Sequence, residues 1–488
     1  MVRKSLALAA ALALVATQAQ AQAQDAKPQP TLAVAKLSDA EASRRIDAVI
    51  ARVLARPEAA GLSIAVARGD RIIYERGAGW ADVEHKRPAD AATEFRIGSL
   101  TKQFTAAAIM KLVERGKIGL DDPLAKYLPE FDTGGRTVTI RQLLNHASGI
   151  PNYTAQPGFG AISAKADLSP RDVLGLLKGV PFDFEPGKGW AYSNTNYVLL
   201  GLIVEKVSGV SYPQFVEREL FKPLRLTRSR YDAGDSVVAD RALGYKFDPA
   251  ASVLRPADPI NMAGPFAAGA LASTGGDLIR WQIALTEGRA VSAASFRTMT
   301  ESAVKTGQGD AAYGFGLITD TAAGTRRVWH NGGINGFNSV LTWWPDLGLR
   351  TAVVSNSEGL PSGAVEQLII ASLTSDRPLP PARTGAEPGS QAALRSLLSG
   401  VTSGSPDYAL LAPPLADLMH KQLPMIQHML QDLGPLQSLA FKGVDLNGAD
   451  RYLARFANGG MLFSLSLDPQ GRIGGLFLSP VAPAKAGA

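Results

Sequence analysis

The 488-residue sequence predicts a mixed α/β fold followed by a small C-terminal α+β domain. Three observations support this prediction. Segments with strand character lie at both ends of the larger region, around 61–77 and 327–355, whereas helical patterns dominate between them. This layout implies a sheet that is closed by segments far apart in the sequence. A stretch rich in Pro and Gly near residue 380 then precedes a helical segment and a run of short strands.

The N-terminal residues predict an export signal. Two basic residues precede an apolar run over 6–16, and small residues two apart follow at 19–23, as in a cleavable secretory signal peptide. We therefore expect a signal peptide over 1–23, a flexible leader over 24–37, and a protein that is secreted or periplasmic after cleavage. No later stretch reaches the roughly 18 apolar residues of a membrane helix, so no membrane span is expected.

The composition argues against several classes of protein. The chain has 50 Lys and Arg against 44 Asp and Glu, and no basic run is interleaved with aromatic residues, so no nucleic-acid partner is expected. Cysteine is absent, which excludes disulfides, and the five histidines include no His-x-x-x-His pair, so no metal site is expected. The sequence carries no signal for the oligomeric state.

The larger domain is expected to span 38–376. It begins with Ser38-Asp-Ala-Glu41, a capping-box pattern that predicts the start of a helix ending near Ala55. A hairpin of two strands follows, around the turn Gly69-Asp70. The remaining elements are helices over 139–146, 170–177 and 197–207 and strands over 327–329, 338–344 and 350–355.

The smaller domain is expected over 393–480, after a linker over 377–392. Its first part, up to 432, is mostly helical, whereas 439–478 resembles a run of antiparallel strands separated by Asn-Gly and Asp-Pro-Gln-Gly turns. The Ala- and Pro-rich tail at 481–488 is expected to be disordered. No group of catalytic residue types occurs in this domain.

The stretch 95–116 predicts the opening and body of one helix, because apolar residues recur at three- and four-residue spacing, with Gly98 and Ser99 marking the start and Gly116 the end. Ser99 and Lys102 would then lie on one face, one turn apart, so the amine could accept the hydroxyl proton. A lysine can serve as this base only if desolvation or nearby positive charge keeps it neutral. The spacing alone is not specific, since Ser302-Ala-Val-Lys305 repeats it.

Tyr192 and Asn194 form the chain's only Tyr-x-Asn, in a Gly-containing loop before an apolar helix. A tyrosine oxygen near a lysine amine can act as a second base or relay a proton to a leaving group, and an asparagine amide can orient a substrate carbonyl. The alternative interpretation is a tyrosine packed under the loop and an asparagine that caps the helix.

His330-Asn-Gly-Gly333 is predicted at the edge of the late strands, where glycines let the backbone approach a substrate closely. The backbone N–H groups of Ser99 and Gly333 would form an oxyanion hole, in which one donor is worth roughly a hundredfold in rate. His330 would lend positive charge or a hydrogen bond. The alternative is a hairpin turn at these residues. The expected substrate-binding residues are Asn194, His330, Asn331 and Gly332.

Ser99-Leu-Thr-Lys102, Tyr192-Ser-Asn194 and His330-Asn-Gly-Gly333, in this order, resemble the three motifs of the serine β-lactamase and penicillin-recognising hydrolase family. The Tyr-x-Asn form is similar to the class C branch, which includes D-alanyl-D-alanine carboxypeptidases, D-aminopeptidases and esterases. The resemblance covers about 40–375. It implies a β-lactamase-like antiparallel sheet flanked by helices, with an all-helical region and the site between them.

One residue departs from the family pattern. Class C β-lactamases usually carry lysine where this chain has His330, and Asn331 follows instead of Thr or Ser. A permanent ammonium suits recognition of a substrate carboxylate, and an imidazole with a pKa near 6.5 is a weaker, pH-dependent substitute. We therefore expect weak or absent β-lactam hydrolysis.

The main hypothesis is an exported serine hydrolase that forms an acyl-enzyme at Ser99 with an ester or amide, either a small molecule or a peptide. Lys102 and Tyr192 would share the role of base, and no cofactor is needed. The alternative is a catalytically inactive relative that holds a cell-wall peptide or a protein partner in the same groove. An α/β-hydrolase is disfavoured because no Gly-x-Ser-x-Gly occurs in the chain.

Overall fold

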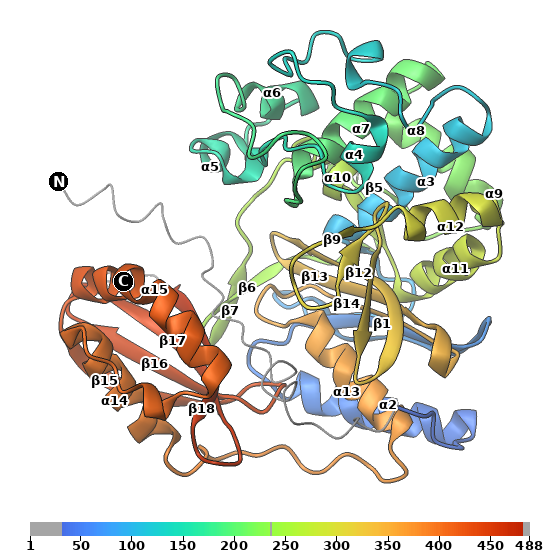
Figure 1. The fold of residues 1–488 in the computed structure, drawn as a ribbon. Helices are drawn as coiled ribbons and strands as arrows, with labels where there is room; N and C mark the ends of the chain where they lie inside the picture. The colour runs from blue at the N-terminus through green and yellow to red at the C-terminus, as the bar shows by residue number, and fades with distance from the viewer. Residues whose placement is uncertain (1–31, 235–236, 482–488) are drawn as a thin grey trace. The chain divides into compact units, whose positions relative to one another are not determined.

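The computed structural model describes residues 32–234 and 237–481 (Figure 1). The expected signal peptide, most of the leader over 24–37 and nearly all of the tail over 481–488 lie outside these residues. The chain divides into two compact units. Among the described residues, one comprises 32–234, 237–247 and 254–378, and the other comprises 248–253 and 379–481. The expected domain boundaries at 376 and 393 stay predictions.

The larger unit contains a nine-stranded antiparallel sheet in the order β3-β2-β1-β14-β13-β12-β11-β10-β9. The first long strand, β1 (Gly61–Arg68), lies between β2 (Arg71–Asp82) and β14 (Leu349–Ser355), so segments far apart in the sequence meet in the middle of the sheet. The prediction of an antiparallel sheet closed by distant segments is confirmed. The other strands of this sheet are β3 (Arg87–Pro88), β9 (Val304–Lys305), β10 (Ala312–Tyr313), β11 (Ile318–Ala322), β12 (Thr325–Ile334) and β13 (Phe337–Trp344).

Helices pack against this sheet because its central strands are apolar on both faces, and every residue of β14 is buried. Two of them, α2 (Asp39–Leu54) and α13 (Ser362–Thr374), pack against each other and against the sheet. Another, α11 (Gly275–Thr286), packs against β1, β2 and β14, and α12 (Ala293–Glu301) follows it.

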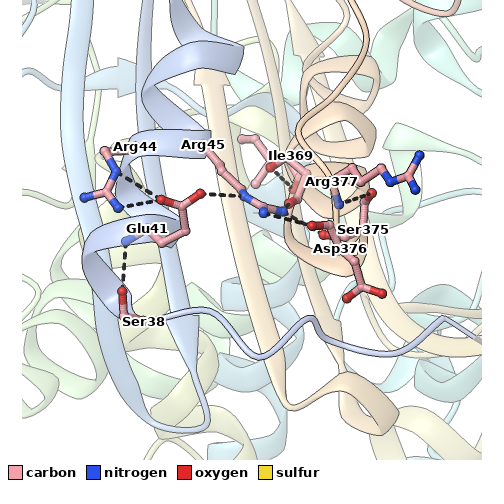
Figure 2. A network of polar contacts seen from close by, with 9 residues as sticks. Ser38, Glu41, Arg44, Arg45, Ile369, Ser375, Asp376 and Arg377 are labelled. Carbon is pink, nitrogen blue, oxygen red and sulfur yellow. Dashed lines mark hydrogen bonds and ion pairs between the residues drawn. The ribbon is translucent and has the colours of Figure 1, made fainter.

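A network around Arg45 joins α2 to the end of α13 (Figure 2). Ser38 caps α2 as predicted, because its side-chain oxygen accepts the N–H of Glu41. Arg45 Nη1 donates to the carbonyl oxygens of Ser372 and Ser375 at 3.0 and 2.6 Å, and Glu41 accepts from Arg45 Nε at 3.0 Å. The guanidinium thus satisfies carbonyl groups that the C-terminal end of a helix leaves without an intrahelical donor.

A helical region surrounds α3 (Thr101–Glu114), in which every residue from Thr101 to Met110 is buried. This helix packs against α7 (Asn194–Ser208) and α10 (Phe266–Gly269). The remaining helices are α4 (Ile140–Leu144), α5 (Phe159–Ile162), α6 (Pro170–Gly175), α8 (Tyr212–Val216) and α9 (Lys222–Leu224). The short strands are β4 (Phe95–Arg96), β5 (Arg230–Tyr231), β6 (Tyr245–Asp248), β7 (Val253–Pro256) and β8 (Leu271–Ser273).

The helix predicted within 95–116, with its start marked by Gly98 and Ser99, is confirmed, and the residues before this start form a strand. Phe95 and Arg96 form β4, which pairs with β8, and the N–H of Ile97 donates to Leu271 O. A short 3₁₀ turn, Gly98–Leu100, then leads into α3.

In the smaller unit, α14 (Ser390–Ser403) and α15 (Pro413–Leu433) precede an antiparallel sheet in the order β15-β16-β17-β18. The predicted order of helices followed by strands is confirmed. The strands are β15 (Leu436–Val444), β16 (Asp450–Phe456), β17 (Gly459–Leu467) and β18 (Ile473–Val481). Across residues 32–234 and 237–481, no helix is both long and apolar enough to cross a membrane.

Candidate active site

Ser99 lies in the 3₁₀ turn between β4 and α3, and this turn packs closely against β12. Gly98 has φ +50, and a Cβ at that position would lie 2.9 Å from the nitrogen and the oxygen of Gly333. The hydroxyl of Ser339 in β13 donates to Ile97 O at 2.7 Å. These contacts require glycine at position 98 and hold the serine beside the third motif.

Lys102 is completely buried, and its amine has three polar neighbours, all of them uncharged. Lys102 Nζ lies 3.0 Å from Ser99 Oγ, 2.8 Å from Asn194 Oδ1 and 2.8 Å from Ala268 O. Burial holds the pKa of this amine well below its usual range. Burial therefore favours the neutral form of this amine.

In the neutral form of the amine, the geometry indicates where its lone pair points. A neutral amine has two N–H groups and one lone pair, and the oxygens of Asn194 and Ala268 can only accept. The two N–H groups are therefore directed at these acceptors. The remaining neighbour is Ser99 Oγ, whose O–H can donate to the lone pair, as a nucleophile requires of its base.

Tyr192 lies in the loop before α7, with its ring centroid 4.8 Å from Lys102 Nζ. Burial raises the pKa of its hydroxyl, and a hydrogen-bonding interaction with Ser99 acts in the opposite direction. The phenol is therefore protonated at neutral pH. Of the two residues expected to share the role of base, Lys102 is the one that burial shifts toward its basic form, and Tyr192 holds a proton it can pass on.

Asn194 is the first residue of α7 and uses its side-chain oxygen to accept from Lys102. Its backbone N–H donates to Asn152 Oδ1 at 3.1 Å, and its Nδ2 has only a long contact of 3.5 Å, to Thr154 Oγ1. The Asn194 side chain therefore binds the Lys102 amine and also faces the site. Asn152 was not expected in the site. The sequence indicates at most that Asn152 caps the short turn that follows it.

His330 is buried, and both ring nitrogens are engaged. Nε2 lies 2.9 Å from the Tyr313 hydroxyl, and Nδ1 lies 2.5 Å from Asn331 O. Burial, followed by the nearby Lys102, lowers the pKa of His330 to about 3. Of the two roles expected for His330, burial disfavours the positive charge, whereas hydrogen bonding remains open to it.

The two glycines of the third motif differ in their surroundings. The pairing of β12 with β11 ends at Trp329, so residues 330–334 pair with β13 alone, and the 3₁₀ turn lies against them. A Cβ at Gly332 would lie 2.1 Å from Ile97 O and 2.9 Å from Ser99 N, whereas a Cβ at Gly333 would have no atom within 4 Å. Gly332 therefore permits close packing, and Gly333 borders open space.

The alternative of a hairpin turn at 330–333 is wrong. The turn follows two residues later, where Gly336 has φ +84, and His330 to Gly333 belong to β12. Asn331 is exposed at the surface of this strand. The structure thus brings the 3₁₀ turn, the loop before α7 and the end of β12 together around the serine.

A separate cavity of about 460 Å³ lies in the helical region. Its lining includes Phe131, Arg136, Leu177, Phe182 and Leu202, and none of the residues expected in the site. It contains neither a candidate nucleophile nor a neutral base, so the chemistry is not expected there.

Comparison with known proteins gives concordant matches. Penicillin-binding protein 4* of Bacillus subtilis (strain 168) is 33% identical over 310 residues, which cover 61% of this chain and 68% of that protein. Other curated relatives are matched over 42% of their length.

Two solved structures are also similar to this chain. A D-stereospecific amidohydrolase from Streptomyces sp. is 28% identical, with a TM-score of 0.58 over 70% of this chain and 100% of its own. The octameric penicillin-binding protein homologue from Pyrococcus abyssi is 26% identical, with a TM-score of 0.61 over 88% of this chain and 94% of its own. This second match extends beyond the larger unit.

The family model described as Beta-lactamase matches residues 46–374, the region that contains all three motifs. The proteins similar to this chain include penicillin-binding proteins and an amidohydrolase with the same fold. The chain therefore belongs to the Beta-lactamase family, the serine β-lactamase and penicillin-binding-protein-like hydrolases.

Proposed function

We propose that this chain is an exported serine hydrolase that cleaves an ester or amide through an acyl-enzyme on Ser99. One observation carries the proposal: Lys102 is buried with Nζ 3.0 Å from Ser99 Oγ and with the uncharged oxygens of Asn194 and Ala268 as its other hydrogen-bond partners, an environment that favours the neutral amine. A lysine held in this state serves as a base, because it does not first have to lose a proton to water.

In the acylation step, Ser99 Oγ attacks the substrate carbonyl carbon and gives its proton to Lys102 Nζ. The backbone N–H groups of Ser99 and Gly333 stabilise the oxyanion. The bond to the leaving group then breaks, and the leaving oxygen or nitrogen takes a proton from the Tyr192 hydroxyl, which Lys102 reprotonates. Water attacks the ester carbonyl in the second step, its proton passes through the same groups to Ser99 Oγ, and the acid product leaves.

The substrate class follows from the third motif. Neutral His330 supplies no charge for a substrate carboxylate. This supports a peptidase- or esterase-type substrate without a carboxylate at that position, and weak or absent activity on β-lactams. Similarity to a D-stereospecific amidohydrolase supports amides among the substrates.

Export is proposed from the sequence of residues 1–23. The test is to express the full chain in a Gram-negative bacterium and to measure the intact mass of the protein in the periplasm and medium. Loss of about 21 to 23 N-terminal residues is expected. A full-length protein that stays in the cytoplasm would contradict export but leave the enzymatic proposal intact.

The test of the enzymatic proposal is intact-protein mass after incubation with a fluorophosphonate and, separately, with a penicillin. Wild type is expected to gain one fluorophosphonate adduct, and a folded Ser99→Ala variant none. Rapid formation and loss of a penicilloyl adduct would overturn the expectation of weak β-lactamase activity. If folded wild type takes neither label, Ser99 is not activated, and the alternative of an inactive relative that binds a peptide or partner replaces the proposal.

A further inference from the structure

His146, in the segment after α4, is a buried residue with an unusual backbone. Its φ is +61, and among the described residues it is one of six non-glycine residues with positive φ. Four of the six are exposed, and the two buried ones are His146 and Phe266. A left-handed conformation costs about 1–2 kcal/mol for a residue with a side chain, and it persists where the surroundings impose it.

Two hydrogen bonds from His146 flank Tyr192. The carbonyl oxygen of His146 accepts the N–H of Ala191 at 3.2 Å, and its ring Nδ1 accepts the N–H of Ser193 at 3.3 Å. The residues immediately before and after Tyr192 are thus both bonded to the same residue. This two-point contact fixes the backbone from which the tyrosine side chain leaves the loop.

The His146 ring also contacts the Tyr192 ring directly. Their centroids are 4.5 Å apart at an interplanar angle of 46°, and the ring of Tyr313 lies at 4.5 Å as well. Tyr313 in turn bonds His330 of the third motif. His146 therefore holds the tyrosine by its backbone and by its ring, and it connects the second motif with the third.

The hydrogen bonds define the protonation of this histidine. Backbone N–H groups only donate, so Nδ1 carries no proton and the neutral ring holds its proton on Nε2. Nε2 has no hydrogen-bond partner among the described residues. Burial, together with the nearby Lys102 and His330, lowers the pKa of His146 well below its usual range.

An unpartnered buried N–H costs about 1–3 kcal/mol, in addition to the cost of the backbone conformation. Stability alone does not explain a residue that carries both costs. We propose that His146 is a positioning residue that holds the Tyr192 hydroxyl at Ser99, an inference that rests on the proposed function. The two hydrogen bonds to its neighbours and the ring contact carry this assignment.

The test compares His146→Ala with His146→Asn. Asparagine places an amide oxygen near the position of Nδ1 and tolerates a positive φ, whereas alanine offers no acceptor. We expect His146→Ala to slow fluorophosphonate labelling of Ser99 and kcat by roughly 100-fold with KM little changed, because small misplacement of a catalytic group has effects of this size. His146→Asn is expected to stay within about 10-fold of wild type. Thermal unfolding of each variant identifies any that do not fold.

A second readout is independent of activity. 3-Fluorotyrosine is placed at position 192, and its ¹⁹F resonance is recorded in wild type and both variants. We expect one narrow resonance in wild type and His146→Asn, and a broadened or divided one in His146→Ala. If wild type cannot be labelled at Ser99, the proposed function is refuted. A changed ¹⁹F spectrum in His146→Ala would then still support the positioning role of His146. A folded His146→Ala variant with the wild-type spectrum and labelling rate would overturn the role of His146.

Discussion

Asn194 Oδ1 lies 2.8 Å from Lys102 Nζ, closer to the amine than Ser99 Oγ is. The nearest side-chain oxygen to the buried lysine is thus an uncharged amide. This choice of residue matters, because a carboxylate at that distance favours the ammonium form of a lysine, whereas an amide leaves desolvation to favour the neutral form.

Asn194→Asp is therefore expected to raise the pKa of Lys102 and to protonate it at neutral pH. The rate of fluorophosphonate labelling should fall at least tenfold at pH 7 and recover as the pH rises, which shifts the rising limb of the pH–rate profile to higher pH. Labelling across pH 6 to 10 in wild type and variant measures this shift. A parallel loss at every pH would show instead that Asn194 acts only by contacting substrate.

The adjacent glycines of the third motif provide a matched pair. Gly332→Ala places a Cβ 2.1 Å from Ile97 O, so the contact between β12 and the 3₁₀ turn must open. We expect a loss of about 1–3 kcal/mol in the free energy of unfolding and a large loss of labelling.

Gly333→Ala meets no atom within 4 Å and is expected to change the free energy of unfolding by no more than about 0.5 kcal/mol. Its methyl group borders the open space beside Ser99, so KM should rise. Urea unfolding and steady-state kinetics of both variants provide the comparison. Equal stability of the two variants would contradict the close packing at Gly332.

The lowered pKa of His330 predicts a dependence of stability on pH. The folded protein keeps this ring neutral down to about pH 3, whereas the unfolded chain takes up a proton near pH 6.5. Between these two pH values the unfolded state binds more protons than the folded state. The contribution of His330 to the free energy of unfolding is therefore fully present above about pH 6.5 and falls by about 1.4 kcal/mol for each pH unit below it.

His330→Gln removes this titration and can keep a bond to the Tyr313 hydroxyl. Between pH 6.5 and 5, wild type should lose about 2 kcal/mol more than the variant in urea unfolding. The other ionisable groups are common to both proteins and cancel in the difference. Identical losses would mean that His330 is not held neutral.

The sequence predicted the elements that depend on local pattern. The helix after Ser38, the hairpin of β1 and β2, and the helices and strands of the smaller unit all follow from spacing, caps and turn residues. Ser99 and Lys102 are also local, since three residues separate them. Tyr192 and His330 were found through motifs that resemble a family, because no local rule brings residues so far apart together.

What the sequence did not predict depends on tertiary contacts. β4 exists because β8 pairs with it, and His330 is neutral because Tyr313 and the surrounding core bury it. The roles of Asn152 and His146 arise from hydrogen bonds to Asn194, at the start of α7, and to Ser193, just before it, between residues more than forty positions apart.

Arg45 and Arg44 provide a test of the connection between α2 and α13. Arg45 has 10% of its side chain exposed and donates to the carbonyl oxygens of Ser372 in α13 and of Ser375 just after it, whereas Arg44 is 69% exposed and pairs with Glu41 (Figure 2). Arg45→Met should lower the free energy of unfolding by about 1–3 kcal/mol, because buried carbonyls lose their donors, and Arg44→Met by less than about 0.5 kcal/mol.

Tryptophan fluorescence is the suitable probe for this comparison. All six tryptophans, at positions 80, 190, 281, 329, 343 and 344, belong to the larger unit, so urea unfolding followed by their emission reports on that unit alone. Labelling of Ser99 should be unchanged in both variants, since neither arginine contacts the site. Equal stability of the two variants would show that solvent replaces the Arg45 guanidinium at the end of α13. The hydrogen bonds of Arg45 would then not contribute to holding α2 and α13 together.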